Sequence, residues 1–130
     1  MKRAKFLTIT FGILLLLGVT LMLLERGYFG PPVITVVNDS GSKITSLVLE
    51  GDGFSATLPD VGPGDAVTTI VHPSGESSLK INFQHGGRVV TKDDLVYIES
   101  DGGYVTIITV QWGGQVKCQS GFGFSWKRAI

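Results

Sequence analysis

The hydrophobic pattern of this chain changes once, near residue 32. Phe6 to Leu24 is a run of 19 residues without a charge. A helix of that length spans about 28 Å, close to the thickness of a bilayer's hydrocarbon core. From Val33 onward, short apolar or alternating runs are separated by Gly, Asp, Asn, Ser and Pro. The pattern predicts one transmembrane helix followed by a β-rich domain.

The flanks of the apolar run predict how the chain lies in the membrane. Lys2, Arg3 and Lys5 precede the run, whereas Glu25 and Arg26 roughly cancel after it, and positive residues stay on the cytoplasmic side. We therefore expect a cytoplasmic basic segment at 1–5, a signal-anchor helix at 6–24, a Gly/Pro stalk at 25–32 and an extracytoplasmic domain at 33–130. The predicted location is the inner (plasma) membrane, with the domain periplasmic or extracellular.

A cleaved signal peptide is the alternative interpretation of the leader. Signal peptides have apolar regions of about 7 to 15 residues, followed by small residues at the cleavage site. The nearest match, Gly18-Val19-Thr20, would leave the apolar segment 21–24 on the mature protein. The sequence therefore favours an anchor that is kept.

Nine short segments after Pro32 have the composition and period of β-strands. The clearest is Ser78–Gln84, in which Leu79, Ile81 and Phe83 alternate with polar residues. Tyr104–Gln111 is apolar or β-branched on both faces, which predicts a central strand covered on both sides. The other predicted strands are Val33–Val37, Ile44–Glu50, Phe54–Leu58, Ala66–Val71, Arg88–Thr91, Leu95–Glu99 and Gln115–Gln119.

The spacing of these segments predicts the fold class. Gly-, Asp- and Asn-rich turns separate them about every 10 residues, as in sandwiches and small barrels. We predict an all-β domain, a small antiparallel immunoglobulin-like β-sandwich of seven to nine strands. The Cys…Trp…Cys core of antibody domains is missing from the sequence.

Charge and cysteine content restrict the possible partners. The leader holds four of the 11 basic residues and one of the 11 acidic ones, so the domain has a net charge of −3. Nucleic-acid binding needs a basic surface, and we expect no nucleic-acid partner. The single Cys118 cannot form a disulfide within the chain.

No motif in the sequence indicates an enzyme, a metal site or a bound cofactor. The only histidines, His72 and His85, flank a predicted strand and would lie roughly 20 Å apart, too far for one metal ion. Asp93 and Asp101 bracket another strand instead of sharing a calcium loop. Cys118 has only Lys117 as a basic neighbour, and on a strand that side chain would point to the opposite face. We predict a non-catalytic protein.

The candidate binding residues are aromatic. Phe122, Phe124 and Trp126 alternate with Gly or Ser in the tail, so on a strand the three rings would line one face. They could form a final strand that closes the core, or a strip that binds a partner, since aromatic residues are enriched in interface cores. Trp112, at a predicted hairpin tip, is the fourth candidate.

These patterns together predict a docking or accessory module of the cell envelope, anchored in the membrane and binding another envelope protein. The alternatives are a small-ligand or glycan binder that uses the exposed aromatics, and an inhibitory or protective protein that caps another protein. The sequence pattern alone does not separate them.

Overall fold

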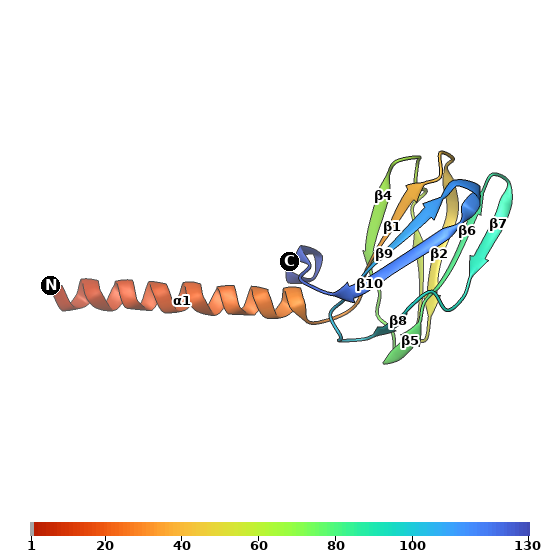
Figure 1. Ribbon diagram of the computed structural model, residues 1–130. Helices are drawn as coiled ribbons and strands as arrows, with labels where there is room; N and C mark the ends of the chain where they lie inside the picture. The colour runs from red at the N-terminus through yellow and green to blue at the C-terminus, as the bar shows by residue number, and fades with distance from the viewer. Residues whose placement is uncertain (1) are drawn as a thin grey trace.

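The computed structural model describes residues 2–130; Met1, part of the predicted segment 1–5, lies outside the described residues. Helix α1 (Lys2–Tyr28) extends away from a β-rich head (Figure 1). By length and composition α1 is long and apolar enough to cross a membrane, and none of its apolar window is buried by the rest of the described chain. The helix includes 25–28, which the sequence assigned to the stalk, so the connection to the head is only Phe29 to Pro32.

Ten strands and two short helices follow α1. The strands are β1 (Val33–Asp39), β2 (Ile44–Gly51), β3 (Phe54–Leu58), β4 (Ala66–Ile70), β5 (Glu76–Ser78), β6 (Lys80–His85), β7 (Arg88–Lys92), β8 (Tyr97–Glu99), β9 (Tyr104–Gln111) and β10 (Val116–Phe122). The 3₁₀ turn η1 (Trp112–Gly114) joins β9 to β10, and the one-turn helix α2 (Trp126–Ala129) follows β10.

The alternating pattern placed most strands correctly. The bounds predicted for Phe54–Leu58 and Tyr104–Gln111 are confirmed, and most others differ by one to three residues. The exception is Ser78–Gln84, which is divided between β5 and β6 and brings the count above the predicted seven to nine. Leu79 interrupts it: its N–H donates to Val96 O and its carbonyl accepts from Leu95 N–H. The chain therefore changes partner at Leu79, from β8 to β2.

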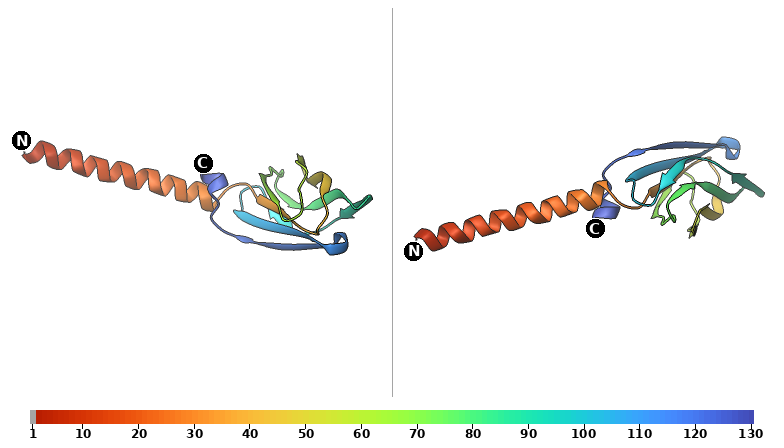
Figure 2. Two further views of the ribbon diagram at one scale, coloured as in Figure 1. Left: turned by 90° about the horizontal axis from the view of Figure 1, so that it is seen from above. Right: turned by 90° about the horizontal axis from the view of Figure 1, so that it is seen from below.

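Two four-stranded sheets form the head. One has the order β10-β9-β1-β4 and the other β3-β2-β6-β7, and β5 and β8 form a separate pair. The two sheets lie as layers in the views of Figure 2. The prediction of a β-sandwich is confirmed, but not as an entirely antiparallel one, because β1 and β9 pair in parallel from Val33↔Val105 to Asp39↔Gln111. Periodicity shows which face a residue takes and carries no information on which strands pair.

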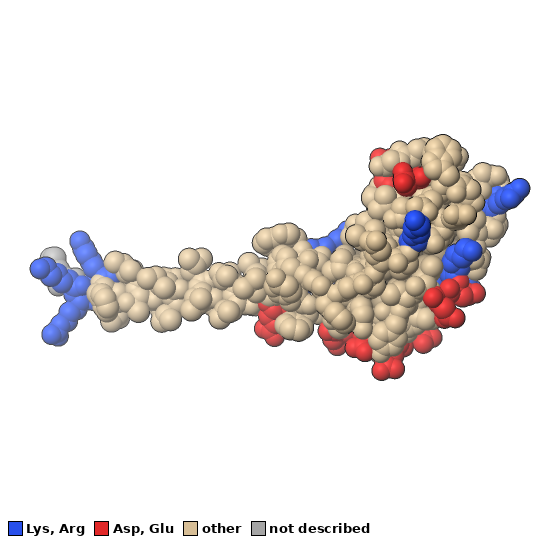
Figure 3. Space-filling model, viewed as in Figure 1, with Lys and Arg blue, Asp and Glu red and all other residues tan. Residues whose placement is uncertain are grey.

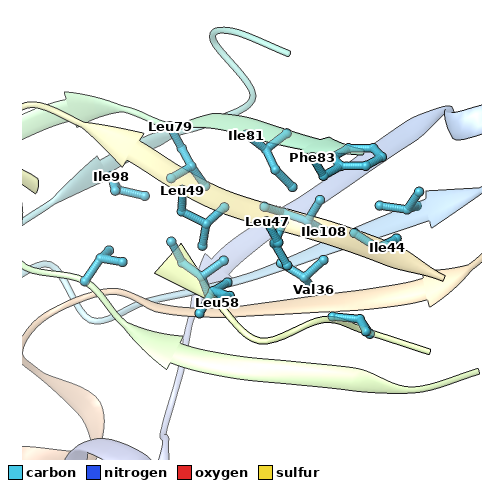
Figure 4. Packing of buried hydrophobic residues seen from close by; sticks show 14 residues of the cluster. Val36, Ile44, Leu47, Leu49, Leu58, Leu79, Ile81, Phe83, Ile98 and Ile108 are labelled. Atoms are coloured by element: carbon cyan, nitrogen blue, oxygen red, sulfur yellow. The ribbon is translucent and has the colours of Figure 1, made fainter. Parts of the chain in front are cut away.

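The core lies between the two sheets and is aliphatic except for one phenylalanine. Strand β6 contributes Ile81 and Phe83, which are at most 1% exposed, and they point towards residues of the opposite sheet such as Val36 and Ile108 (Figure 4). Fully burying side chains of this kind contributes about 1.5–3 kcal/mol each. The residues predicted to share one face of Ser78–Gln84 are therefore the core residues, as the alternation required.

Candidate functional site

The outer face of the β10-β9-β1-β4 sheet is the first candidate surface. Backbone pairing aligns its residues in three rows across the strands. The rows are Ile70, Val33, Val105 and Gly121; Thr68, Thr35, Ile107 and Gln119; and Ala66, Val37, Thr109 and Lys117. We call these twelve residues the outer face. Lys117 is its only charged member, and most others are β-branched or apolar. Figure 3 shows the corresponding side of the head as largely uncharged.

The outer face is more exposed to solvent than its apolar composition would suggest. Ile107, at its centre, is 41% exposed, and most of its neighbours are half-buried or exposed, although Val33 is buried. The sequence predicted that β9 is central and covered on both sides. β9 does lie between β1 and β10, but no helix or strand of residues 2–130 covers Ile107. An apolar strand surface is thus open where the sequence expected a cover.

The opposite sheet presents a different outer face. On it, Lys80 lies 3.9 Å from the Glu50 carboxylate and 3.7 Å from that of Asp93. Asn82 donates to Glu50 Oε2 at 3.1 Å, and Thr91 donates to Asn82 Oδ1 at 2.6 Å. These polar groups satisfy one another while remaining hydrated, so this face is suited to solvent and has no need of a partner.

Trp112 lies at the end of the head, in η1. Its ring packs over the turn at Gly41, where any added Cβ would overlap the indole. The side chain is nevertheless 74% exposed. The structure therefore places this predicted binding residue on the surface, and it remains a candidate for contact with a partner.

The tail does not form the single aromatic strand that the sequence suggested. β10 ends at Phe122, and residues 123–125 lead into α2. Phe122 is 74% exposed and packs against Tyr104, with ring centroids 4.7 Å apart. Phe124 and Trp126 lie elsewhere, so the three rings do not share one face. None of the three is in the sandwich core.

Phe124 and Trp126 lie against the end of α1 instead. The ring of Phe124 is 5.3 Å from that of Tyr28 and 4.9 Å from that of Trp126, both in edge-to-face geometry. Gly27 permits this approach, since an added Cβ there would overlap the Phe124 ring. The N–H of Ser125 also donates to Gly27 O at 2.7 Å. The tail therefore returns to the helix that begins the chain (Figure 1).

Arg128 connects three parts of the molecule. Its guanidinium donates to Gly27 O through Nε at 3.2 Å and through Nη2 at 2.9 Å. Nη1 donates to Pro31 O at 3.4 Å and to Tyr104 O at 3.3 Å, and Nη2 also donates to Gly123 O. We call this arrangement the Arg128 clasp. A cation at the carboxyl end of a helix is also stabilised by the helix dipole.

The remaining polar candidates are dispersed. His72 is exposed beside the connection between α1 and the head. His85 ends β6, and its buried Nε2 has no hydrogen-bond partner among residues 2–130. Asp93 and Asp101 lie on separate exposed segments. Cys118 is half-buried on β10, and burial raises the pKa of its thiol. Acidic side chains gather along the edge formed by β5 and β8 (Figure 3), where the hydrogen bond to the Glu99 carboxylate and burial raise the pKa of Tyr97.

Sequence reasoning missed the Arg128 clasp and the outer face. Arg128 was not among the candidate residues predicted from the sequence. The contact of the forked Arg128 guanidinium with four backbone carbonyls cannot be deduced without knowing that the tail folds back onto α1. The outer face did leave a signal, because Tyr104–Gln111 was apolar on both sides.

Comparison with known proteins identifies no family. No protein-family model matches the chain, and no curated protein matches it. Among solved structures, the chain is similar to an NMR structure of a protein from Eubacterium rectale, with 12% identity and a TM-score of 0.49. That similarity covers 69% of this chain and 87% of the other. At these values it supports no statement about function.

Proposed function

We propose that this protein is a single-pass membrane protein whose head is a non-catalytic docking module for another envelope protein. In this proposal α1 remains uncleaved in the inner (plasma) membrane, with its basic end in the cytoplasm and the head outside. Lys2, Arg3 and Lys5 at one end of α1 support this orientation. A tether of this kind raises the effective concentration of a partner held in the same membrane.

The observation that carries the docking proposal is the contrast between the two outer faces of the sandwich. One face has a network of charged and amide side chains, and the other has Ile107 at the centre of an almost uncharged grid. Interface cores are depleted of charged residues, and the outer face has that composition. Trp112, beyond one end of β10, would extend the same contact surface.

We also propose an immunoglobulin-like arrangement for the head. Two packed four-stranded sheets support an immunoglobulin-like arrangement. The parallel pairing of β1 with β9 departs from the antiparallel sheets of that fold. We therefore propose a variant of the arrangement in which the strand following the anchor lies beside β9.

Ligand binding is less well supported. Two polar hollows on the head are lined by Gly75, Glu76 and residues 99–102, and by segments 50–52 and 93–94 with Ser78 and Lys80. Neither contains the aromatic side chains predicted for stacking on a sugar or a small apolar ligand. A protein that caps another protein would use the same outer face as a docking module, and the partner's identity would separate these two roles.

Site-specific photocrosslinking in native membranes tests the docking proposal. A photoreactive residue replaces Ile107 on the outer face, and in a matched protein it replaces Val89, which is 72% exposed on β7 of the opposite sheet. We expect a discrete protein adduct from position 107 and none from position 89. The same adduct from both positions, or none from position 107, would rule out the outer face as the docking surface.

A further inference from the structure

If α1 spans a bilayer, the position of the Arg128 clasp along the helix determines how deep in the bilayer the clasp lies. The apolar run ends at Leu24, and Gly27 lies about 4.5 Å farther along the helix axis. The headgroup layer on each side of the hydrocarbon core is about 5–7 Å thick. Gly27 and the groups bonded to its carbonyl therefore fall within the headgroup layer.

Helix α2 lies at the same depth as Gly27. Ser125, its N-cap, donates its backbone N–H to Gly27 O at 2.7 Å, and Arg128 of α2 donates to the same carbonyl at 2.9 Å. All three ribbon views show α2 beside the end of α1 (Figures 1 and 2). α2 would thus touch lipid headgroups as soon as α1 is inserted.

Three aromatic residues are among those exposed at this depth. Tyr28 is 50% exposed, Phe29 66% and Trp126 64%, and we call these three residues the collar. Tyr and Trp are enriched at membrane–water interfaces, where an apolar ring and a polar edge are both accommodated. We propose that the collar inserts into the headgroup layer, so that α2 is a second membrane contact of the head. This inference rests on the proposed membrane-spanning role of α1.

The charges beside the collar nearly cancel, which indicates the kind of lipid surface that it would contact. Glu25 and Asp101 line a hollow together with Arg26 and Phe29. Lys127 donates to Thr68 O at 2.6 Å, and Arg128 is occupied by the clasp. Among these described residues, three cations (Arg26, Lys127 and Arg128) and two carboxylates (Glu25 and Asp101) leave a net charge of only +1, so the collar does not depend on an anionic headgroup. A zwitterionic phosphatidylcholine surface is sufficient.

A second contact changes how the head is held. A single helix would leave the head free to swivel and tilt around the short connection 29–32. The collar is fixed both to α1, through Phe124 on Gly27, and to the head, through the Arg128 clasp. With the collar in the headgroups, the outer face would be presented at one angle to the membrane surface.

The two tryptophans of the chain allow a direct test in the full-length protein. In phosphatidylcholine vesicles, Trp112→Phe leaves Trp126 as the only reporter, and Trp126→Phe leaves Trp112 at the far end of the head. Lipids brominated near the headgroup quench indoles at that depth. We expect Trp126 to emit at shorter wavelength than Trp112, since it would lie in the headgroup layer. Replacing the ordinary lipid by the brominated lipid should lower Trp126 emission about two-fold and leave Trp112 emission unchanged. Adding phosphatidylglycerol should leave both results the same.

A third protein separates failure of the collar from failure of the anchor. With both native tryptophans replaced by Phe, Leu15→Trp places an indole at the middle of the apolar run, where bromines at mid-chain should quench it. Quenching of the residue-15 reporter without quenching of Trp126 would overturn the collar and leave the anchor standing. If neither is quenched, the membrane-spanning role of α1 fails, and the collar fails with it.

Discussion

Replacing Arg128 by alanine should loosen the connection between α1 and the head. The guanidinium donates to carbonyls of Gly27, Pro31, Tyr104 and Gly123, so one side chain holds the helix, the connection and strand β9. Burial lowers the pKa of Arg128, but an arginine remains charged at neutral pH. Each of these bonds is therefore charge-assisted and stronger than a neutral hydrogen bond.

The free energy lost in Arg128→Ala depends on how many of these hydrogen bonds water can replace. A hydrogen bond to a charged group contributes about 1.5–3 kcal/mol. Because Arg128 is only half-buried, water would hydrate part of the carbonyls that lose their hydrogen bonds in Arg128→Ala. We therefore expect a net loss of about 2 kcal/mol, the value of about one such bond. This corresponds to about a thirty-fold increase in local opening, since 1.4 kcal/mol is a factor of ten.

Hydrogen exchange followed by mass spectrometry measures this opening in the full-length protein. The reporting amides include Ser125, whose N–H is bonded to Gly27 O, and Gly103, whose N–H is bonded to Gly30 O. In Arg128→Ala these amides should exchange about thirty-fold faster, and those of β2 and β6 should not change. Arg128→Lys should give an intermediate result, because an ammonium cannot reproduce the planar fork.

A matched substitution serves as the control for Arg128→Ala. Arg88 is exposed at the start of β7, far along the chain from the junction, and Arg88→Ala should leave exchange at Ser125 and Gly103 unchanged. Equal exchange in the wild type and Arg128→Ala would refute the reasoning, because it would mean that the aromatic packing of Phe124 holds the junction without the clasp.

Two further predictions concern Gly27 and Cys118. Gly27→Ala places a methyl group where the Phe124 ring lies, so it should displace that ring and raise the exposure of residues 124–129 to limited proteolysis. Gly18→Ala, with open space around it, should not, and equal proteolysis of the two proteins would contradict the packing. Burial raises the pKa of Cys118, so its thiolate fraction at pH 8 should be lower, and alkylation slower, than in the urea-unfolded chain. Because the unfolded thiol loses its proton first, stability should fall as pH rises through the unfolded pKa, and a Cys118→Ser protein should lose that dependence in urea titrations.

The sequence was sufficient where a local pattern determines the structure. Period-two alternation identified Ile81 and Phe83 as core residues, and the charge-free run identified the helix. These features depend only on neighbours along the chain. Leu79 shows the limit, because its alternation continues unbroken while its backbone partner changes from one strand to another.

The candidate surfaces depended on contacts between distant segments. The outer face requires β1 to lie between β4 and β9, and the parallel pairing that produces this order leaves no mark in the alternation. Arg128 lies 101 residues from Gly27, and nothing near Arg128 in the sequence indicates that partner. Alternation along the tail suggested a strand as far as Trp126, whereas β10 ends at Phe122 and the residues after it pack against α1.

The position of β1 also determines how the head would respond to mechanical load. β1 follows directly after the connection to α1 and is paired with β9 along its whole length and with β4 from Val33 to Val37. Once the Arg128 clasp has opened, a pull on α1 would run along β1, so the bonds of both ladders would be loaded together in shear and could not be peeled open singly. The first strand after α1 is therefore the one best placed to resist extraction of the chain from the folded head.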